Sequence, residues 1–256
     1  MTPRLFVDTQ LENDLAAPLS AAQVHYLKNV LRLEQGASVL LFNGRDGEFA
    51  AEIVEMKKRG GIAKTTAKTR DLQTEPDLQL AFAPVKRGPL EMIIQKAVEI
   101  GVARLTPIIT ERTNAPKVNV ERLQAIAVEA AEQCGRVSVP SVDAPVKLDQ
   151  LLKTWPDDRR LMFCDEAGDD ETEEWGGRDG RAKPVLDALK EFDRKPQPWT
   201  VLTGPEGGFT ADERAALRGN AFVIPVTLGP RILRADTAAI AALTLWQAAL
   251  GDWHRS

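Results

Sequence analysis

The sequence is poor in the residues that build disulfide frameworks and metal sites. It contains only two cysteines, Cys134 and Cys164, and only two histidines, His25 and His254. Two cysteines cannot form the several cross-links of a small secreted scaffold, so we expect both to be buried, reduced thiols. No Cys-x-x-Cys pair occurs and the histidines are far apart. These absences exclude the common kinds of zinc site, and we expect no metal.

Long apolar runs are absent too. No segment approaches the roughly 20 consecutive apolar residues that a membrane-spanning helix needs, and Met1–Arg4 leads into strand-like residues rather than a signal peptide. Of the 256 residues, 43% are hydrophobic and 27% are charged, which is typical of a globular protein with one large or two modest domains. We therefore expect a cytoplasmic protein with no membrane partner.

Charge is unevenly distributed. The net charge of −4 argues against a nucleic-acid partner, but residues 165–174 alone carry seven acids and no base, and the rest of the chain is at +3. A second segment has six bases and no acid: Lys57, Lys58, Arg59, Lys64, Lys68 and Arg70. Such a segment can follow a phosphate backbone, or it can protect the edge of a solvated hairpin. The sequence leaves both interpretations open.

The first 70 residues have the pattern of a small β domain. Strand-like runs occur at 4–7, 38–42, 49–54 and 62–69. Ser20 and Gln23 form a capping box that opens one helix, with apolar residues at helical spacing: Val24, Leu27, Val30 and Leu31. Several short strands and one helix indicate a small barrel, followed by a polar linker at 71–77.

From residue 78 onward, strand patterns alternate with helix patterns. Strands are expected at 78–83, 102–110, 160–164, 199–202 and 222–228, with helical runs between or after them. This alternation predicts an α/β fold with a parallel sheet and helices on its faces. Ligands of such sheets bind outside the carboxyl ends of the strands.

Two glycine-containing loops follow the last two predicted strands, at 203–209 and 228–239. The first, which begins Gly204-Pro205-Glu206, is neither a P-loop nor a dinucleotide fingerprint. Its glycines nevertheless permit positive φ and close approach of backbone amides to a ligand. A strained turn without a ligand is the alternative for either loop alone. Two such loops at adjacent strand ends can form the walls of one pocket.

Several side chains in these loops have a structural and a functional interpretation. Thr210 and Glu213 form a second capping box and are interpreted as structural. Thr237 is interpreted mainly as a helix cap. Arg234 is next to Asp236 in a simple ion pair or, given its loop, contacts a substrate.

The two loops together resemble a known family. Residues 204–213 and 228–238, supported by His25–Leu33, Gln95–Val102 and Glu129–Arg136, are similar to the bacterial 16S ribosomal RNA uracil-N3 methyltransferases of the SPOUT superfamily. The resemblance extends over nearly the whole chain in the right order. The chain departs from the family at Asp236, where the family often has Glu, and in an acidic insertion near 168–182.

The resemblance implies a PUA-like RNA-binding β-barrel at 1–72 and a SPOUT methyltransferase domain at 76–256, whose parallel sheet carries a carboxyl-terminal trefoil knot, a rare exception to unknotted topology. It also implies a homodimer that binds S-adenosyl-L-methionine. The implied cofactor residues are Glu166, Leu202, Thr203, Gly204, Glu206, Gly207, Gly208, Leu228, Gly229, Ile232, Leu233, Ala235, Thr237 and Ala238.

The implied reaction methylates N3 of a uridine in 16S rRNA of the small ribosomal subunit. Arg234 is the candidate for stabilising the uracil anion, and Glu206 or Asp236 is the candidate base. The candidate RNA-binding residues are Lys28, Arg32, Lys57, Lys58, Arg59, Lys86, Arg87 and Arg136. Two other functions remain open: methylation of another RNA site, and a non-catalytic RNA-binding module.

Overall fold

The computed structural model describes residues 2–114, 117–170, 172–173, 176–177 and 179–254. The chain divides into two compact units, each described here by itself. Unit 1 comprises residues 1–74 and 128–139, and unit 2 comprises residues 75–127 and 140–256. The segment that spans their boundary, Asp71–Asp77, has no regular structure apart from a bend at its end, as its polar sequence predicts.

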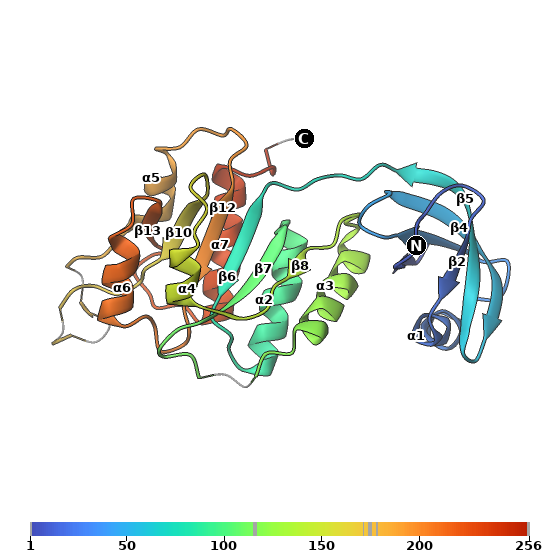
Figure 1. Cartoon of the computed structure of the whole chain (residues 1–256), viewed down its shortest axis with the longest axis horizontal. Helices are drawn as coiled ribbons and strands as arrows, with labels where there is room; N and C mark the ends of the chain where they lie inside the picture. The colour runs from blue at the N-terminus through green and yellow to red at the C-terminus, as the bar shows by residue number, and fades with distance from the viewer. Residues whose placement is uncertain (1, 115–116, 171, 174–175, 178, 255–256) are drawn as a thin grey trace. The chain divides into compact units, whose positions relative to one another are not determined.

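Unit 1 is built on a five-stranded mixed sheet (Figure 1). Its strand order is β1-β3-β4-β5-β2, in which β1 is parallel to β3 and the other neighbours are antiparallel. Bulges shift the β4–β5 register at three places, and bulges bend a sheet around its core. The elements are β1 (Arg4–Phe6), β2 (Ala16–Leu19), α1 (Ala21–His25), η1 (Tyr26–Val30), β3 (Ser38–Phe42), β4 (Glu48–Lys57) and β5 (Gly60–Arg70).

The predicted helix of unit 1 is shorter than its apolar pattern indicates. The Ser20–Gln23 capping box opens α1 as expected, but the chain continues as the π-helix η1. The wider turn of a π-helix changes the rotation between successive side chains. Val24 and Leu27 are therefore buried, whereas Val30 and Leu31 are exposed, which corrects the single apolar face expected from the sequence.

The buried carboxylate of Glu48 binds two arginines of unit 1. Glu48 accepts hydrogen bonds from Arg4 Nε at 2.7 Å and from Arg70 Nε at 2.9 Å. Both arginines also donate to carbonyls near the end of α3 (Val120–Cys134): Arg4 to Ala131 O and Arg70 to Gly135 O, each at 2.9 Å. Cations at a helix carboxyl terminus satisfy its free carbonyls and its dipole. The last part of α3 is thereby fixed to unit 1.

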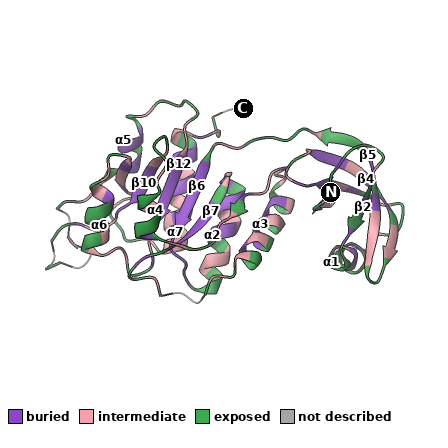
Figure 2. Cartoon of the chain, in the orientation of Figure 1, coloured by how far each residue is buried: buried purple, intermediate pink, exposed green. Residues whose placement is uncertain are grey.

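Unit 2 is an α/β unit whose sheet is entirely parallel, as the alternating pattern predicts. The strand order is β11-β13-β10-β12-β6-β7-β8, and β9 also pairs with β7. The strands are β6 (Leu78–Phe82), β7 (Arg104–Ile109), β8 (Ser141–Val142), β9 (Val146–Lys147), β10 (Arg160–Cys164), β11 (Lys183–Pro184), β12 (Trp199–Thr203) and β13 (Val223–Thr227). The central strands β6 and β12 are buried along their length, and β10 is buried after its first residue (Figure 2).

Helices cover both faces of this sheet. One face packs on residues of α4 and α6, among them Leu148 and Leu217, around Phe163 and Leu202. On the other, α7 packs against β12, α2 and α5. These helices are α2 (Arg87–Ile100), α4 (Leu148–Lys153), α5 (Val185–Leu189), α6 (Ala211–Arg218) and α7 (Ala235–Ala249). With both faces covered, only the ends of the sheet remain open to a ligand.

Candidate active site

The main cavity of unit 2 has a volume of about 1240 Å³ and lies at the carboxyl ends of β6, β7, β10 and β12. Pockets for small molecules commonly measure about 300–1,000 Å³, so this cavity can hold a nucleoside-sized ligand with space remaining. Its lining comes from five segments: Lys86, Arg112, Cys164–Asp170 with Glu173 and Gly176, Thr203–Phe209 with residues of α6, and Ile232–Ala235 with Ala238. The cavity is at the sheet edge that the sequence indicates.

Most of the predicted cofactor residues line this cavity. They are Glu166, Thr203, Gly204, Glu206, Gly207, Gly208, Ile232, Leu233, Ala235 and Ala238, and Arg234 joins them. Four do not: Leu202 is fully buried in β12, while Leu228, Gly229 and Thr237 are in the second loop and the helix after it, outside the lining. The structure thus brings both glycine loops to one space.

Two of the three glycines of the first loop, Gly204 and Gly208, have a conformational reason. A Cβ on Gly204 would lie 2.5 Å from the ring of Phe209, which itself packs edge-on against Phe163 at 5.0 Å between ring centroids. A Cβ on Gly207 would lie 3.4 Å from Cβ of Arg112. Gly208 has φ +67°, in the left-handed region. The chain therefore runs close to its neighbours here, and its backbone amides border the cavity.

The helix that follows this loop begins with the predicted capping box. Thr210 Oγ1 accepts a hydrogen bond from Glu213 N at 3.3 Å, and Glu213 Oε2 accepts from Thr210 N at 3.0 Å. Glu213 Oε1 also accepts from Glu111 N at 2.8 Å, which links the loop after β12 to the loop after β7. The structural interpretation of Thr210 and Glu213 is confirmed.

Glu166 connects the ends of β10 and β13. Its carboxylate accepts hydrogen bonds from Leu228 N at 2.9 Å and from Thr227 Oγ1 at 3.1 Å. Burial raises the pKa of Glu166 above its usual range, against the opposing effect of these two bonds. Gly229, with φ +126°, turns the chain directly afterwards. Glu166 therefore determines where the second loop begins.

The start of α7 differs from the prediction. The N-cap is Arg234, and Thr237 is inside the helix, so the interpretation of Thr237 as the cap is wrong. Asp236 Oδ1 accepts a hydrogen bond from Thr237 N at 2.8 Å. An aspartate in the first turn can satisfy a free amide locally, which removes the need for a threonine cap. Asp236 does not line the cavity, whereas Glu206 does.

Two arginines of α6 hold the acidic segment after β10. The carboxylate of Asp165, which is 2% exposed, accepts hydrogen bonds from Arg214 Nε at 2.9 Å and from Arg218 Nε at 2.7 Å. The same guanidinium groups reach Asp169 and the carbonyls of Gly168 and Gly180. Part of the negative charge is thus balanced inside unit 2. Glu171 and Glu174 of this segment lie outside the described residues.

The cysteines are in different environments. Cys164 is buried at the end of β10, and burial raises the pKa of its thiol. Cys134 is exposed, which corrects the expectation that both thiols are buried. It is the last residue of α3, one turn past the buried Ala130 and Ala131, at a position where the helix ends.

Most of the predicted RNA-binding residues are exposed in unit 1 or at the cavity. Lys28, Arg32, Lys58 and Arg59 are exposed, and they have no ion pair within the part of the chain that the structure describes. Three others contact neighbours: Lys57 pairs with Glu55 at 2.8 Å, Arg87 with Glu91 at 3.0 Å, and Arg136 Nε bonds Ser138 Oγ at 2.8 Å. Lys86 lines the cavity.

Within the basic segment 57–70, some charges have structural partners. Arg70 bonds Glu48, Lys64 pairs with Asp14 at 3.4 Å, and Lys68 pairs with Asp71 at 2.6 Å. The tip of the β4–β5 hairpin, Lys58 and Arg59, keeps unpaired charge among the described residues. Structural partners therefore account for part of this segment, and phosphate binding by its tip stays a prediction.

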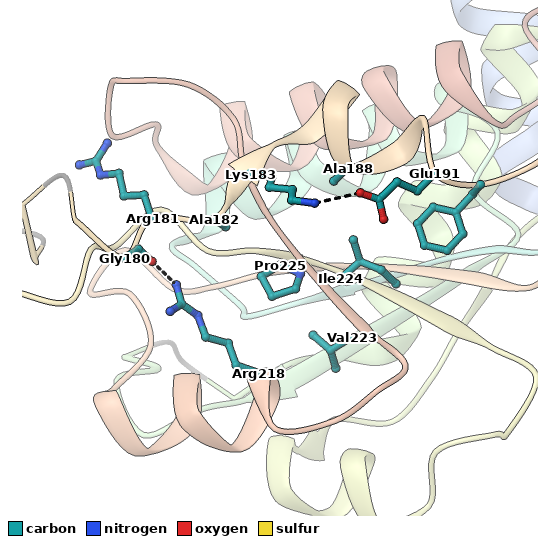
Figure 3. A pocket seen from close by; sticks show the side chains of 11 residues that line it. Gly180, Arg181, Ala182, Lys183, Ala188, Glu191, Arg218, Val223, Ile224 and Pro225 are labelled. Carbon is teal, nitrogen blue, oxygen red and sulfur yellow. Dashed lines mark hydrogen bonds and ion pairs between the residues drawn. The ribbon is translucent and has the colours of Figure 1, made fainter.

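A second, smaller hollow of about 450 Å³ lies between β11, α5 and β13. Figure 3 shows Lys183 joined to Glu191 across it and Arg218 joined to Gly180 at its side. The other labelled side chains are mostly apolar, with Val223, Ile224 and Pro225 from β13 on one wall. Lys183, Glu191 and Arg218 have charged partners, Arg181 donates to Gly177 O at 2.8 Å, and none of the predicted site residues lines this hollow.

Arg112, Arg214 and Arg218 also line the cavity and were not predicted from the sequence. Arg112 had a usable signal, because it follows β7, and β7 is the sheet neighbour of β6. Arg214 and Arg218 are one turn apart on α6 and had no signal of their own, since basic residues on an exposed helix face are ordinary. Among the described residues, no group of three or more potential metal ligands is assembled, and no helix has the length and apolar character to cross a membrane.

Fold and cavity together define an α/β protein that binds a ligand at the ends of a parallel sheet and carries a separate small β unit. The RNA methyltransferase domain family matches residues 72–247, and the RNA methyltransferase PUA domain matches residues 19–65. The chain belongs to this RNA methyltransferase family.

Curated relatives match over nearly the whole of this chain. The Ribosomal RNA small subunit methyltransferase E of Rickettsia conorii is 33% identical over 94% of this chain and 93% of its own. The protein of the same name from Synechocystis is 32% identical over 95% of this chain and 76% of its own.

Two solved structures share the fold of the whole chain. A putative methyltransferase from Legionella pneumophila, in complex with the bound cofactor SAM, has a TM-score of 0.84 at 32% identity, over 98% of this chain and 99% of that one. A Ribosomal RNA small subunit methyltransferase E from Neisseria gonorrhoeae, bound to S-adenosyl methionine, has a TM-score of 0.83 at 27% identity, over 99% and 100%.

Proposed function

We propose that this protein transfers a methyl group from S-adenosyl-L-methionine to N3 of a specific uridine in 16S rRNA of the small ribosomal subunit. The observation that carries the proposal is the convergence of both glycine loops, from 203–209 and 228–235, on one cavity at the ends of a parallel sheet. Relatives that match over the whole chain are named as small-subunit rRNA methyltransferases, and two structures with this fold were solved with the cofactor.

The residues of the cavity fit this cofactor. A side chain at Gly204 would collide with the Phe209 ring, and Gly208 has a left-handed φ, so the chain there presents backbone groups. Ile232 and Leu233 add an apolar surface suited to an adenine ring, and Ala235 and Ala238 keep the start of α7 narrow. The cofactor supplies an electrophilic methyl group on a sulfonium, so the protein's main task is to position the reactants.

The remaining task is to make N3 of uracil nucleophilic. N3 carries a proton in neutral uracil and faces the Watson–Crick partner in a helix, so the target base must be unpaired. Arg234, exposed at the cavity, is suited to stabilise the negative charge that develops on the uracil. Of the two candidate bases, Glu206 lines the cavity and Asp236 does not, which favours Glu206.

Unit 1 would hold the RNA through its exposed cations. Lys28, Arg32, Lys58 and Arg59 are suited to phosphate contacts. Its bulged five-stranded sheet around one apolar core supports a PUA-like barrel, with predicted domain limits of 1–72 and 76–256. The link from Glu166 to Leu228, which joins the segment after β10 to the loop after β13, is compatible with a trefoil knot.

The exposed surface of α7 supports a homodimer. Ile240, Ala241, Thr244 and Leu245 are only partly buried, and Ala248 is exposed, so the helix is apolar on its outer face as well as its inner one. Helices that are apolar all round are normally covered, and we propose that a second copy covers this one. An rRNA substrate also supports the proposal of a cytoplasmic location.

Binding and turnover test this proposal separately. Calorimetry with S-adenosylmethionine, S-adenosylhomocysteine, ATP and NAD should show binding of the first two alone. Transfer of labelled methyl groups should then be seen on small subunits from cells that lack the protein. Cofactor binding without transfer to any RNA would favour the non-catalytic module, and transfer to a different RNA would reject the substrate.

A further inference from the structure

The cations that line the cavity fall into two groups. Arg214 and Arg218 are paired with Asp165 and Asp169. Lys86, Arg112 and Arg234 line the same cavity and have no carboxylate partner within the ranges that the structure describes. These three come from segments far apart in sequence, and all three are exposed. These three cations can therefore bind an anion, although the carboxylates of Glu166, Asp170, Glu173 and Glu206 line the same cavity.

Arg112 is held in place from two directions. Its turn is closed by Thr113 N to Thr110 O at 3.1 Å and by Thr110 N to Thr113 Oγ1 at 2.9 Å. The amide of the preceding residue, Glu111, is bonded to Glu213 at 2.8 Å. Because the turn is fixed, the backbone of Arg112 is already ordered. Less entropy is therefore lost when its side chain binds a ligand.

The guanidinium of Arg112 is only partly used inside the protein. Its Nη1 donates to Gly207 O at 3.0 Å, and its stem packs so closely on Gly207 that an added Cβ there would touch it. A guanidinium has five N–H donors in a planar fork, so most of them remain for a ligand. A planar fork without a carboxylate, at an exposed cavity edge, suits a phosphate.

Lys86 adds a second cation at a helix terminus that does not favour positive charge. It is the N-cap of α2, and its side chain makes no capping bond. A helix amino terminus favours an anion, so a lysine there does not stabilise the helix. Helix capping therefore does not explain this lysine. Because Lys86 lines the cavity, a ligand of the cavity explains it best.

We infer that Arg112 and Lys86 bind backbone phosphates of the RNA beside the nucleotide that enters the cavity, and so place its base against Arg234. The inference rests on the proposed function and names the part of the site that grips the RNA chain. The cavity volume of about 1240 Å³ leaves space for a nucleotide beside a cofactor. A carboxylate of the cofactor is the competing anion, and binding measurements separate the two.

The test uses Arg112→Met and Lys86→Met in the full-length protein, with Arg122→Met as the matched control. Arg122 is exposed and paired with Glu91 outside the cavity. Anisotropy measures binding of a small-subunit rRNA fragment over a salt series, and calorimetry measures binding of S-adenosylmethionine. Each cavity variant should weaken RNA binding about 10-fold or more and reduce the log–log salt slope by about 0.7–0.9, whereas the control should match the wild type.

Cofactor affinity distinguishes the ligands. Lys86→Met should leave it within about 2-fold, and Arg112→Met should lower it only severalfold through the lost bond to Gly207, with Arg112→Lys restoring much of the RNA affinity. Unchanged salt slopes in both methionine variants, or a loss confined to the cofactor, would overturn the inference. A wild type that binds RNA but does not methylate it would instead reject the proposed function, because binding is measured without turnover.

Discussion

At the scale of single residues, the two arginines of the second loop provide a direct comparison. Arg234 lines the cavity, whereas Arg231, three positions earlier and equally exposed, does not. Arg234→Ala should reduce turnover about 100-fold or more, the usual cost of removing a group that stabilises developing negative charge. Its cofactor affinity should stay within about 3-fold. Single-turnover kinetics and calorimetry measure the two effects, and Arg231→Ala is the control.

Wild-type turnover in Arg234→Ala would remove its proposed role in catalysis. If turnover and cofactor affinity fell together, Arg234 would instead be a cofactor residue. The result for Arg231→Ala shows whether loss of any positive charge in this loop is sufficient to reduce turnover.

The stability of unit 1 depends on a single carboxylate. Burial alone would raise the pKa of Glu48, but hydrogen bonds from Arg70, Arg4 and Thr69 lower it from 4.5 to about 2. Because its folded pKa is depressed, the stabilisation is complete above pH 4.5 and is lost as pH falls through about 2. The shift corresponds to about 3 kcal/mol. Urea unfolding at a series of pH values should show stability falling below pH 4.5.

Glu48→Gln should unfold more easily at neutral pH by about 3 kcal/mol, because Arg4 and the partly exposed Arg70 lose the carboxylate that both bind. Its unfolding free energy should change less between pH 5 and pH 3 than that of the wild type. An unchanged pH dependence would show that other acids dominate there.

At the scale of elements, the first glycine loop is the most sensitive to substitution. Gly204→Ala places a Cβ 2.5 Å from the Phe209 ring, which must then leave its contact with Phe163. We expect cofactor affinity to fall about 10-fold or more, as the loop amides shift. Calorimetry tests this, with Gly219→Ala at the far end of α6 as control. Equal affinity in Gly204→Ala and the wild type would show that the loop does not shape the cofactor site.

Elements with strong local signals were predictable from the sequence. The parallel sheet of unit 2, both capping boxes and the polar linker follow from periodicity and capping chemistry. The location of the cavity follows from a general rule about strand ends. Features that depend on contacts distant in sequence were not predictable. No local pattern shows that Arg214 and Arg218 fold back onto Asp165, or that Arg112 rests on Gly207.

The two wrong predictions about helices have local causes. The helix after Ser20 changes to a π-helix, so a pattern read at 3.6 residues per turn placed Val30 and Leu31 on the wrong side. At the start of α7, the helix already begins after Arg234, and Asp236 accepts a hydrogen bond from the amide of Thr237, which was expected to be the cap. In both cases the sequence allows two local solutions, and the structure uses the less common one.

At the scale of the whole molecule, the outer face of α7 should be a dimer interface. Sedimentation equilibrium should give twice the chain mass of 28.1 kDa. Ala241→Glu, on the partly exposed face of α7, should shift the protein to monomer, because a charge would be buried in the interface without a partner. Ala216→Glu on the exposed side of α6 is the control. A wild-type monomer, or a dimer unaffected by Ala241→Glu, would contradict this.

The central claim is that the cavity of unit 2 serves methylation of uracil N3 in 16S rRNA. Mass spectrometry of nucleosides from purified small-subunit rRNA, in cells with and without this protein, tests it most directly. The account predicts that N3-methyluridine is present with the protein, disappears in its absence and returns with the wild type but not with Arg234→Ala. The same amount of N3-methyluridine in both cell types would contradict it.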